Sequence, residues 1–185
     1  MYTHKKLLLS ISIALCFILT NCSPEEIKDR IEDEFGGTDG TDFVAKVNGK
    51  QFGASLENVH AYITVTENVY TVAIGAGAVE GLTLGKAIAI AFSGSDYDEL
   101  NAGSTHNSTE GQYPAGAGYE EHYTDSNEDY ETDEVESIYI KVTAIDKSNL
   151  TISGEFNFTA IDEDTNTTYT VTDGKFSNIP YEIIQ

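Results

Sequence analysis

Residues 149–179 read NLTISGEFNFTAIDEDTNTTYTVTDGKFSNI, and this stretch carries the clearest structural signal in the chain. In its first half, apolar residues or glycine occupy every second position, and polar residues fill the positions between them. The apolar positions are Leu150, Ile152, Gly154, Phe156, Phe158 and Ala160. A period of two predicts a β-strand with one buried face and one solvated face.

The alternation stops at the polar residues 162–166, resumes at 168–172 and continues to Phe176. Two alternating runs joined by a short polar segment predict a long β-hairpin. We expect Phe156, Phe158, Val171 and Phe176 to lie in the core. The upstream chain is then interpreted as further sheet that covers the apolar face of this hairpin.

The N-terminus has the form of a secretory signal. Lys5 and Lys6 precede an apolar run over residues 7–19 that is too short for a comfortable membrane span. The run ends in LTNC at residues 19–22, which resembles the bacterial lipobox, although Asn21 replaces the usual small residue. We expect residues 1–21 to be a lipoprotein signal peptide and Cys22 to carry palmitate and the other lipid chains of the anchor. The alternative is an ordinary secretory signal.

Residues 22–42 are interpreted as an acidic, flexible tether. Ile27, Ile31 and Phe35 are spaced by four, which permits a turn or two of helix, and the glycine-rich residues 36–41 follow. The acidic residues after Ser23 resemble the export signal of surface lipoproteins from the Bacteroidota, with Pro24 as a departure. We expect a lipid-anchored protein of the outer membrane. Display on the cell surface and orientation toward the periplasm both stay open.

Charge and cysteine content exclude several classes of function. The chain has 10 basic and 31 acidic residues and a formal net charge of −21, which argues against nucleic-acid binding. Its two cysteines, Cys16 and Cys22, both precede the predicted domain at residues 43–185. Disulfides, thiolate metal sites and cysteine nucleophiles are therefore not expected in that domain.

Several short strands that the sequence predicts together indicate an antiparallel all-β domain. Asn48-Gly49 marks a hairpin, and alternation over residues 59–66, 69–76 and 137–146 predicts further strands. Residues 84–92 are apolar on both faces, which predicts a central strand covered on both sides. Four residues of the run at 137–146 are expected to face inward, namely Ile138, Ile140, Val142 and Ala144.

Residues 93–136 are the least regular part, with a short edge strand expected near 119–124 and an acidic loop at 125–136. In total we expect nine or ten strands in a two-sheet sandwich, with a closed lipocalin-like β-barrel as the alternative.

Several motifs together resemble an uncharacterised family of small lipoproteins from the Bacteroidota, a domain of unknown function. The motifs are FVAKVNGKQF, GQYP, IYIKVTAID, ISGEFNFTA and VTDGKFSNI, and they extend over residues 43–179. The resemblance implies the compartment and the fold class. It transfers no catalytic residues, because the motifs are structural.

The search for catalytic chemistry favours a protein that is not an enzyme. The chain has no G-x-S-x-G motif, and His60, His106 and His122 stand in no recognisable triad context. His60 and His106 are expected at the surface. Tyrosines concentrate in the irregular middle, so Tyr113, Tyr119 and Tyr123 are the candidate ligand-binding residues, with rings that can stack on a glycan.

Calcium is the cofactor that the sequence favours. Asp162, Asp164 and Asn166 alternate as in a calcium loop, but Thr167 stands where such a loop needs glycine. The alternative is a polar hairpin tip. A second acidic cluster lies within residues 125–134.

Three functions are carried forward. The first is a non-catalytic module that binds a ligand or partner, a glycan or an envelope protein, through residues 93–136. It predicts that the three candidate tyrosines meet at an open groove. The second is a structural or accessory subunit of an envelope complex, which predicts a contiguous exposed apolar patch. The third is a hydrolase with paired carboxylates, which needs a concave site.

Overall fold

The computed structural model describes residues 42–66, 69–80, 83–123, 128–132 and 134–184. Within these ranges the chain forms β-strands, two short 3-10 helices and no α-helix. The strands are β1 (Phe43–Val47), β2 (Lys50–Ala54), β3 (Val59–Thr66), β4 (Val69–Glu80), β5 (Thr83–Gly94), β6 (Thr105–His106), β7 (Ala115–Tyr123), β8 (Glu128–Glu131), β9 (Glu134–Asp146), β10 (Thr151–Asp162) and β11 (Thr167–Ile184). The 3-10 helices are η1 (Leu56–Asn58) and η2 (Tyr97–Glu99).

The predictions for the N-terminus, including the signal peptide at 1–21, lipidation of Cys22 and nearly all of the tether, lie outside the described residues. In the part of the chain that the structure describes, no helix has the length and apolar character needed to cross a bilayer.

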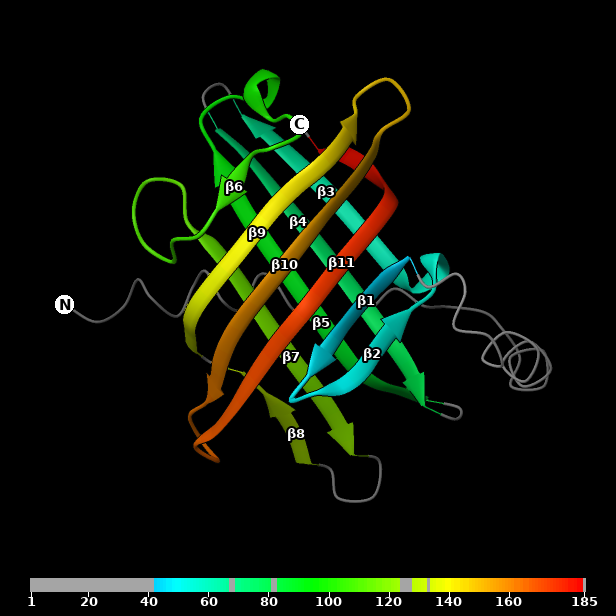
Figure 1. Ribbon diagram of the computed structural model, residues 1–185, viewed down its shortest axis with the longest axis vertical. Helices are drawn as coiled ribbons and strands as arrows, with labels where there is room; N and C mark the ends of the chain where they lie inside the picture. Colours follow the sequence, from blue (N-terminus) through cyan, green and yellow to red (C-terminus); the bar gives the residue numbers. More distant parts are fainter. Residues whose placement is uncertain (1–41, 67–68, 81–82, 124–127, 133, 185) are drawn as a thin grey trace.

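All eleven strands belong to one sheet that curls into a nearly closed barrel. Its main path runs β6-β9-β10-β11-β3-β4-β5-β7-β8, and the β1–β2 hairpin pairs with β11 (Figure 1). Neighbouring strands are antiparallel, except that Tyr181–Ile184 of β11 runs parallel to β3. The predicted all-β class is confirmed. The barrel alternative fits this continuous sheet better than a sandwich of two sheets.

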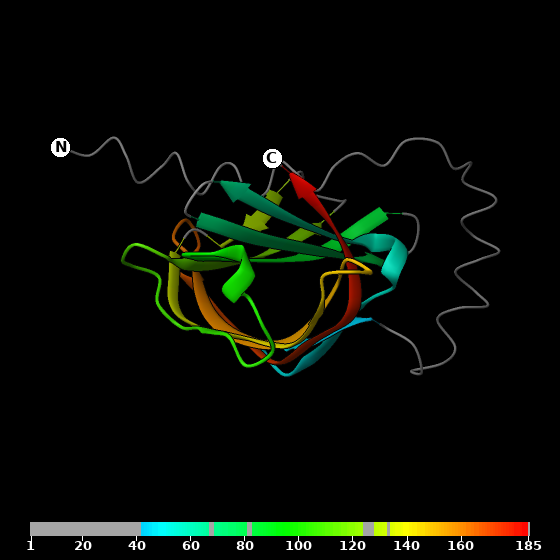
Figure 2. The ribbon, with the colours of Figure 1, turned by 90° about the horizontal axis from the view of Figure 1, so that it is seen from above.

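The barrel is flattened into two layers. Figure 2 shows β3, β4, β5 and β7 as a flat layer above a curved layer of β9, β10, β11 and β1. Strand β11 belongs to both, because its first part pairs with β10 and its last residues pair with β3.

The core lies between these layers and is built around the predicted hairpin. Phe156, Phe158, Val171 and Phe176 are all buried, as expected. The ring of Phe43 in β1 lies 5.1 Å from that of Phe156, centroid to centroid. From the flat layer, the buried side chains include Ile74, Ile88, Ile90 and Phe92.

Two glycines make room for two of these aromatic rings. Gly154 pairs with Phe176 across β10 and β11, and Gly174 pairs with Phe156. A Cβ on Gly174 would lie 2.5 Å from the carbonyl oxygen of Phe156 and 2.7 Å from its ring. Glycine is therefore required for the close contact between ring and backbone at this position.

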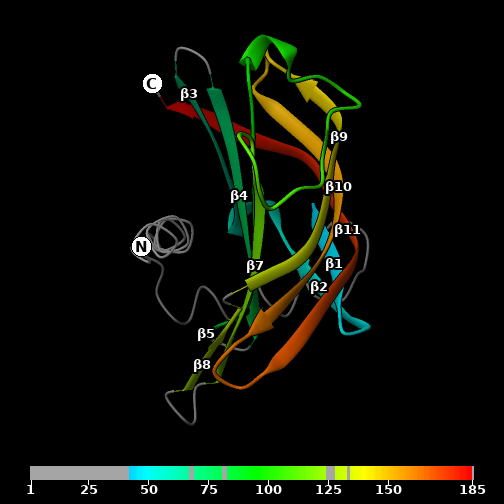
Figure 3. The same cartoon turned by 90° about the vertical axis from the view of Figure 1, so that its left-hand side faces the viewer.

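Two bulges bend β11 as it passes from one layer to the other. The pairing with β10 shifts between Phe156 and Phe158 and again between Ile152 and Gly154, so β11 holds an extra residue at each place. Asp173 and Asn178 have φ of 55° and 52° there. Bulges bend a strand and increase its twist, and Figure 3 shows β11 turning from β10 toward β3.

The hairpin predicted at Asn48-Gly49 is confirmed. Both residues have positive φ, 49° and 80°, and β1 pairs with β2 on either side of them. The Asn48 side-chain oxygen also accepts a hydrogen bond from the Thr170 backbone N–H at 2.8 Å, which fastens the turn to β11.

Three predictions about single strands need correction. Strand β5 lies between β4 and β7 as expected, but only its Ile88–Ile90–Phe92 side is buried, while its alanine side is half-buried. Ala144 is exposed, because one extra residue in β9 shifts the alternation before it is reached. The edge strand expected near 119–124 is the longer β7, which pairs with β5 and with β8.

Candidate binding face of the flat layer

The three predicted ligand-binding tyrosines do not come together. The Tyr119 ring is buried and packs against Tyr169, with centroids 4.9 Å apart, so it is unable to stack on a ligand at the surface. Tyr113 precedes the first residue of β7 and is half-buried, with its hydroxyl accepting a hydrogen bond from Gln112 at 2.9 Å. Tyr123 ends β7, and its side chain lies outside the described residues. Tyr113 lies just before β7 and Tyr123 is the last residue of that strand, so the nine-residue length of β7 separates the two.

The predicted calcium residues form a closed turn between β10 and β11. Asp162 is buried, and its Oδ1 accepts a hydrogen bond from the Thr165 backbone N–H at 2.9 Å. Burial acts to raise the pKa of Asp162, but hydrogen bonds from Thr165 and Asp164 outweigh it and hold the pKa below its usual value. Asp164 and Asn166 are exposed. The Asp162 carboxylate, one of the three predicted calcium ligands, therefore already accepts hydrogen bonds that stabilise the turn.

Acidic residues elsewhere add no metal cluster to the described part of the chain. There, no group of three or more His, Cys, Asp or Glu side chains is arranged to hold an ion. The second acidic cluster, within 125–134, falls partly on residues 125–127 and 133, outside the described ranges, and partly on β8.

Residues 95–104, within the predicted binding segment, form a packed cap over one end of the barrel. Leu100 is completely buried beneath η2. Lys147 Nζ donates to the carbonyl oxygens of Tyr97 and Asp98 at 2.8 and 3.0 Å and lies 4.7 Å from the centre of the Tyr97 ring. The hydroxyls of Tyr97 and Tyr181 are 2.7 Å apart. These contacts fasten the cap to the end of the barrel, although most of its side chains are exposed.

His106 departs from its predicted surface position, whereas His60 is exposed as expected. The His106 ring is half-buried and lies 4.4 Å from Phe92 and 6.5 Å from Tyr70, between centroids. Its Nε2 is buried, and none of the described residues supplies a hydrogen-bond partner. Burial lowers the pKa of His106, partly offset by a hydrogen bond with the Ser93 backbone. Nothing in the local sequence, a loop rich in Gly, Ser and Asn, signals this burial.

The outward face of the flat layer has an unusual composition. Residues in register across β3, β4, β5 and β7 are Tyr62, Ala73, Ala91 and Gly116 in one row, and His60, Gly75, Ala89 and Gly118 in the next. Gly77, Ala87 and Glu120 continue the face toward one end, and Thr71 and Ser93 close the other with a hydroxyl contact of 2.9 Å. We call this surface the smooth face.

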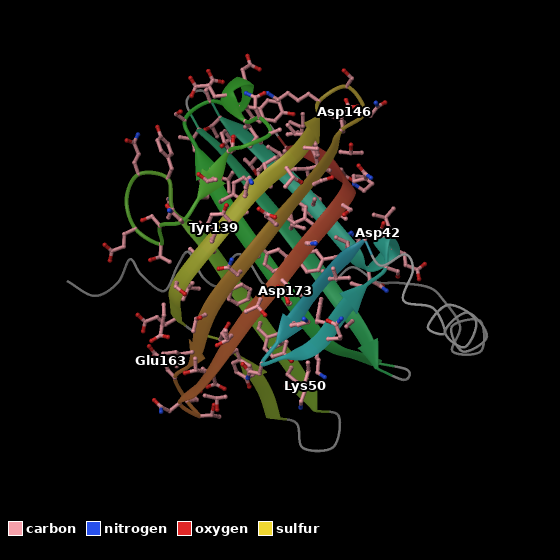
Figure 4. All side chains as sticks on the ribbon, in the orientation of Figure 1. Asp42, Lys50, Tyr139, Asp146, Glu163 and Asp173 are labelled. Carbon is pink, nitrogen blue, oxygen red and sulfur yellow. The ribbon has the colours of Figure 1, made fainter. Side chains whose placement is uncertain are left out.

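The smooth face differs from the outer surface of the curved layer. The outward positions of β10 include Glu155, Asn157 and Thr159, and Figure 4 shows polar side chains such as Tyr139 and Asp173 projecting from the curved layer. A solvated sheet face normally carries such polar residues. The smooth face instead presents alanine and glycine across β4, β5 and β7, over a width of about 10 Å and a length of about 13 Å from Ala73 to Gly77, as strand spacing and rise imply.

Alanine and glycine disfavour strands, so their use on three neighbouring strands, β4, β5 and β7, needs a reason. Glycine within a strand often marks a place where a ligand or another backbone approaches closely. A Cβ added to Gly116 would meet nothing within 4 Å. No strand or 3-10 helix that the structure describes covers this face (Figures 2 and 3). The centre of this face is therefore lined by small, partly exposed residues and lacks the polar side chains of the curved layer.

Comparison with known proteins places the chain in a family. A family model described as a domain of unknown function (DUF6252) matches residues 86–180, from within β5 into β11. The match begins later than the resemblance over residues 43–179 predicts. No curated protein and no solved structure matches the chain. The model covers about half of the sequence and includes the core hairpin, and the chain belongs to the DUF6252 family of domains of unknown function.

Proposed function

We propose that this chain is a lipid-anchored lipoprotein of the outer membrane of a Bacteroidota bacterium, and that its barrel is a non-catalytic docking module. The docking part of the proposal rests on the smooth face, because a sheet surface of small residues suits the close approach of another protein segment. The LTNC sequence at residues 19–22 supports the lipid anchor. Of the functions raised by the sequence, the accessory subunit of an envelope complex fits this surface best.

The anchor is tested by lipid labelling of the full chain in its native cell. We expect palmitate label and membrane fractionation with the native sequence, and loss of both in Cys22→Ser. Cys16→Ser is the matched control, because that cysteine lies within the predicted signal peptide, and it should keep both. Equal labelling of native chain and Cys22→Ser would contradict the proposal.

The docking surface is tested by placing one charge on either layer. Ala89 occupies the centre of the smooth face, and Asn157 is exposed on the curved layer. A protein that co-purifies with the detergent-extracted chain should be lost in Ala89→Glu and retained in Asn157→Glu. Circular dichroism and thermal melting of both variants show whether each remains folded. Retention of every co-purifying protein in folded Ala89→Glu would remove the smooth face as the docking surface.

A further inference from the structure

We propose that residues 105–114, here called the strap, close one side of the barrel, and that protonation of His106 within the strap releases them. This pH-sensitive closure is separate from docking on the smooth face, because it concerns the inner side of the flat layer. Three observations support it: the strap bridges the two ends of the sheet, the His106 ring is packed among apolar groups, and few other contacts hold the strap in place.

The strap lies where the sheet does not close on itself. The strand path begins at β6 and β9 and ends at β7 and β8, and no ladder joins β7 to β9 within the described residues. At its start, the strap pairs as β6 with Lys141 and Ile140 of β9. Farther along, the Ser108 carbonyl accepts a hydrogen bond of 2.7 Å from the N–H of Ala115, the first residue of β7. The strap therefore connects the two ends of the sheet (Figure 1).

The His106 ring fastens the strap from inside the barrel. Its centroid lies 4.4 Å from that of Phe92 and 6.5 Å from that of Tyr70, and both of these side chains are buried. The Nε2 atom is buried too, without a hydrogen-bond partner among the described residues. A proton on this ring would add a positive charge and an N–H donor to an apolar site. Burial disfavours such a charge, so the closed strap requires the neutral imidazole.

Burial outweighs what the titratable and polar groups around the ring contribute. Tyr70 of β4 keeps its proton between pH 5 and pH 7, because burial and then the charge of Glu99 raise its pKa. From β5, a hydrogen bond with the Ser93 backbone only partly offsets the burial that lowers the pKa of His106. From β9, Lys141 is itself cationic and forms an ion pair on the outer surface. The closed site therefore favours the neutral ring.

Apart from this ring, the strap is weakly held. Its strand, β6, has only two residues, and residues 107–112 are exposed. The hydrogen bonds between Ser108 and Glu110 stay within the strap and do not fasten it to the barrel. A short segment with few buried contacts opens at low free energy, without unfolding of the rest. Release of the strap would separate β6 from β9 and uncover Phe92 and Tyr70.

Proton binding and strap opening are linked in a definite direction. In the open form His106 is solvated and has the ordinary histidine pKa of about 6.5, whereas burial lowers its pKa in the closed form. A falling pH therefore favours the open form, because that form binds the proton more readily. Lowering the pH from 7 to 5 raises the ratio of open to closed strap by up to about 25-fold.

Hydrogen exchange of the Ala115 amide tests the release, because its bond to Ser108 breaks when the strap opens. NMR follows the exchange in the full chain extracted in detergent. We expect the protection factor of this amide to fall about five- to 25-fold from pH 7 to pH 5, in the native chain and in His60→Gln. In His106→Phe it should change by less than about twofold, because phenylalanine accepts no proton. In His106→Lys it should be low already at pH 7, since lysine is charged throughout.

Dilute urea distinguishes release of the strap from unfolding of the whole domain. Because the opening is local, urea below the unfolding transition should leave exchange at Ala115 unchanged and speed exchange in β10. Equal pH responses in the native chain and His106→Phe would overturn the inference, and so would the same urea response at Ala115 and in β10. Carbon-13 labelling of His106 measures its pKa in the folded chain, and a value at or above about 6.5 would also contradict the closure.

Discussion

At the scale of single residues, His106 is the group whose chemistry the fold alters most. It reaches from β6 to the inner side of the flat layer, where Phe92 of β5 and Tyr70 of β4 face it. Ile140 pairs with it from β9. Burial raises the pKa of the neighbouring Tyr70, and the charge of Glu99 raises it further. The neutral imidazole therefore suits the site, and the imidazolium does not.

The lowered pKa of His106 predicts a pH-dependent stability. As pH falls below the unfolded value of about 6.5, the unfolded chain takes up a proton that the folded chain still rejects. Stability should therefore be greatest above that value and fall as the pH approaches the lower folded pKa. We expect the melting temperature of the native chain to drop between about pH 7 and pH 5.

Glutamine variants of a buried and an exposed histidine show how much of this pH dependence comes from His106. His106→Gln should flatten the change in melting temperature across that interval. His60→Gln removes an exposed histidine and should leave the change as it is in the native chain. If all three proteins show the same pH profile, the buried His106 ring is not the source of the dependence.

At the scale of elements, β11 determines how the sheet closes. It is 18 residues long, and exposed pairs interrupt its alternation at Thr172–Asp173 and Ser177–Asn178. These interruptions are the two bulges, each with one residue at positive φ. Without the bend, β11 would continue along β10, and the parallel pairing of Tyr181–Ile184 with β3 would not form.

The second bulge predicts how Asn178 responds to substitution. Asn178→Val places a β-branched residue at a φ of 52° and should destabilise the protein by about 1–2 kcal/mol. Asn178→Gly should be nearly neutral, because glycine adopts positive φ readily. Urea denaturation monitored by circular dichroism compares the two. A Val variant as stable as the Gly variant would show that the left-handed conformation is not needed for the bulge.

At the scale of the whole molecule, the cap joins the two layers at one end of the barrel. Tyr97 contacts Tyr181 at the end of β11, and Lys147, in the turn between β9 and β10, binds the carbonyls of η2. The Gly103 backbone N–H donates to Val142 of β9 at 2.8 Å. We therefore expect the cap to unfold with the barrel and not as an independent loop.

A substitution at Leu100 tests whether the cap unfolds together with the barrel. It is fully buried, so Leu100→Ala should cost about 2–5 kcal/mol of unfolding free energy through lost burial and a cavity. Leu56→Ala, at an exposed leucine on η1, should change stability by less than about 0.5 kcal/mol. Denaturation curves followed by near- and far-ultraviolet circular dichroism should coincide for Leu100→Ala. Separate transitions would show a cap that opens alone.

The local patterns of this chain were readable because they depend on near neighbours. The alternation of residues 150–160 and the Asn48-Gly49 turn follow from a period of two and from the φ that two residues tolerate. The burial of Phe156 followed from the same alternation, whereas Phe176 is buried on the side of Val171 only because the bulge at Thr172–Asp173 shifts the alternation by one residue. Even the bulges left a trace, since two polar residues in succession interrupt the pattern at each of them.

What the sequence by itself determined is the all-β class, the main hairpin and its core residues, because side-chain periodicity is a property of the chain. Only the tertiary structure decided that β11 joins two layers into one curled sheet, that Tyr119 and the Nε2 atom of His106 are buried, and that small residues of three strands lie together on one smooth face. Each of these depends on pairings between residues far apart in the chain. Strand order and register set those pairings, and alternation within one strand does not specify its neighbours.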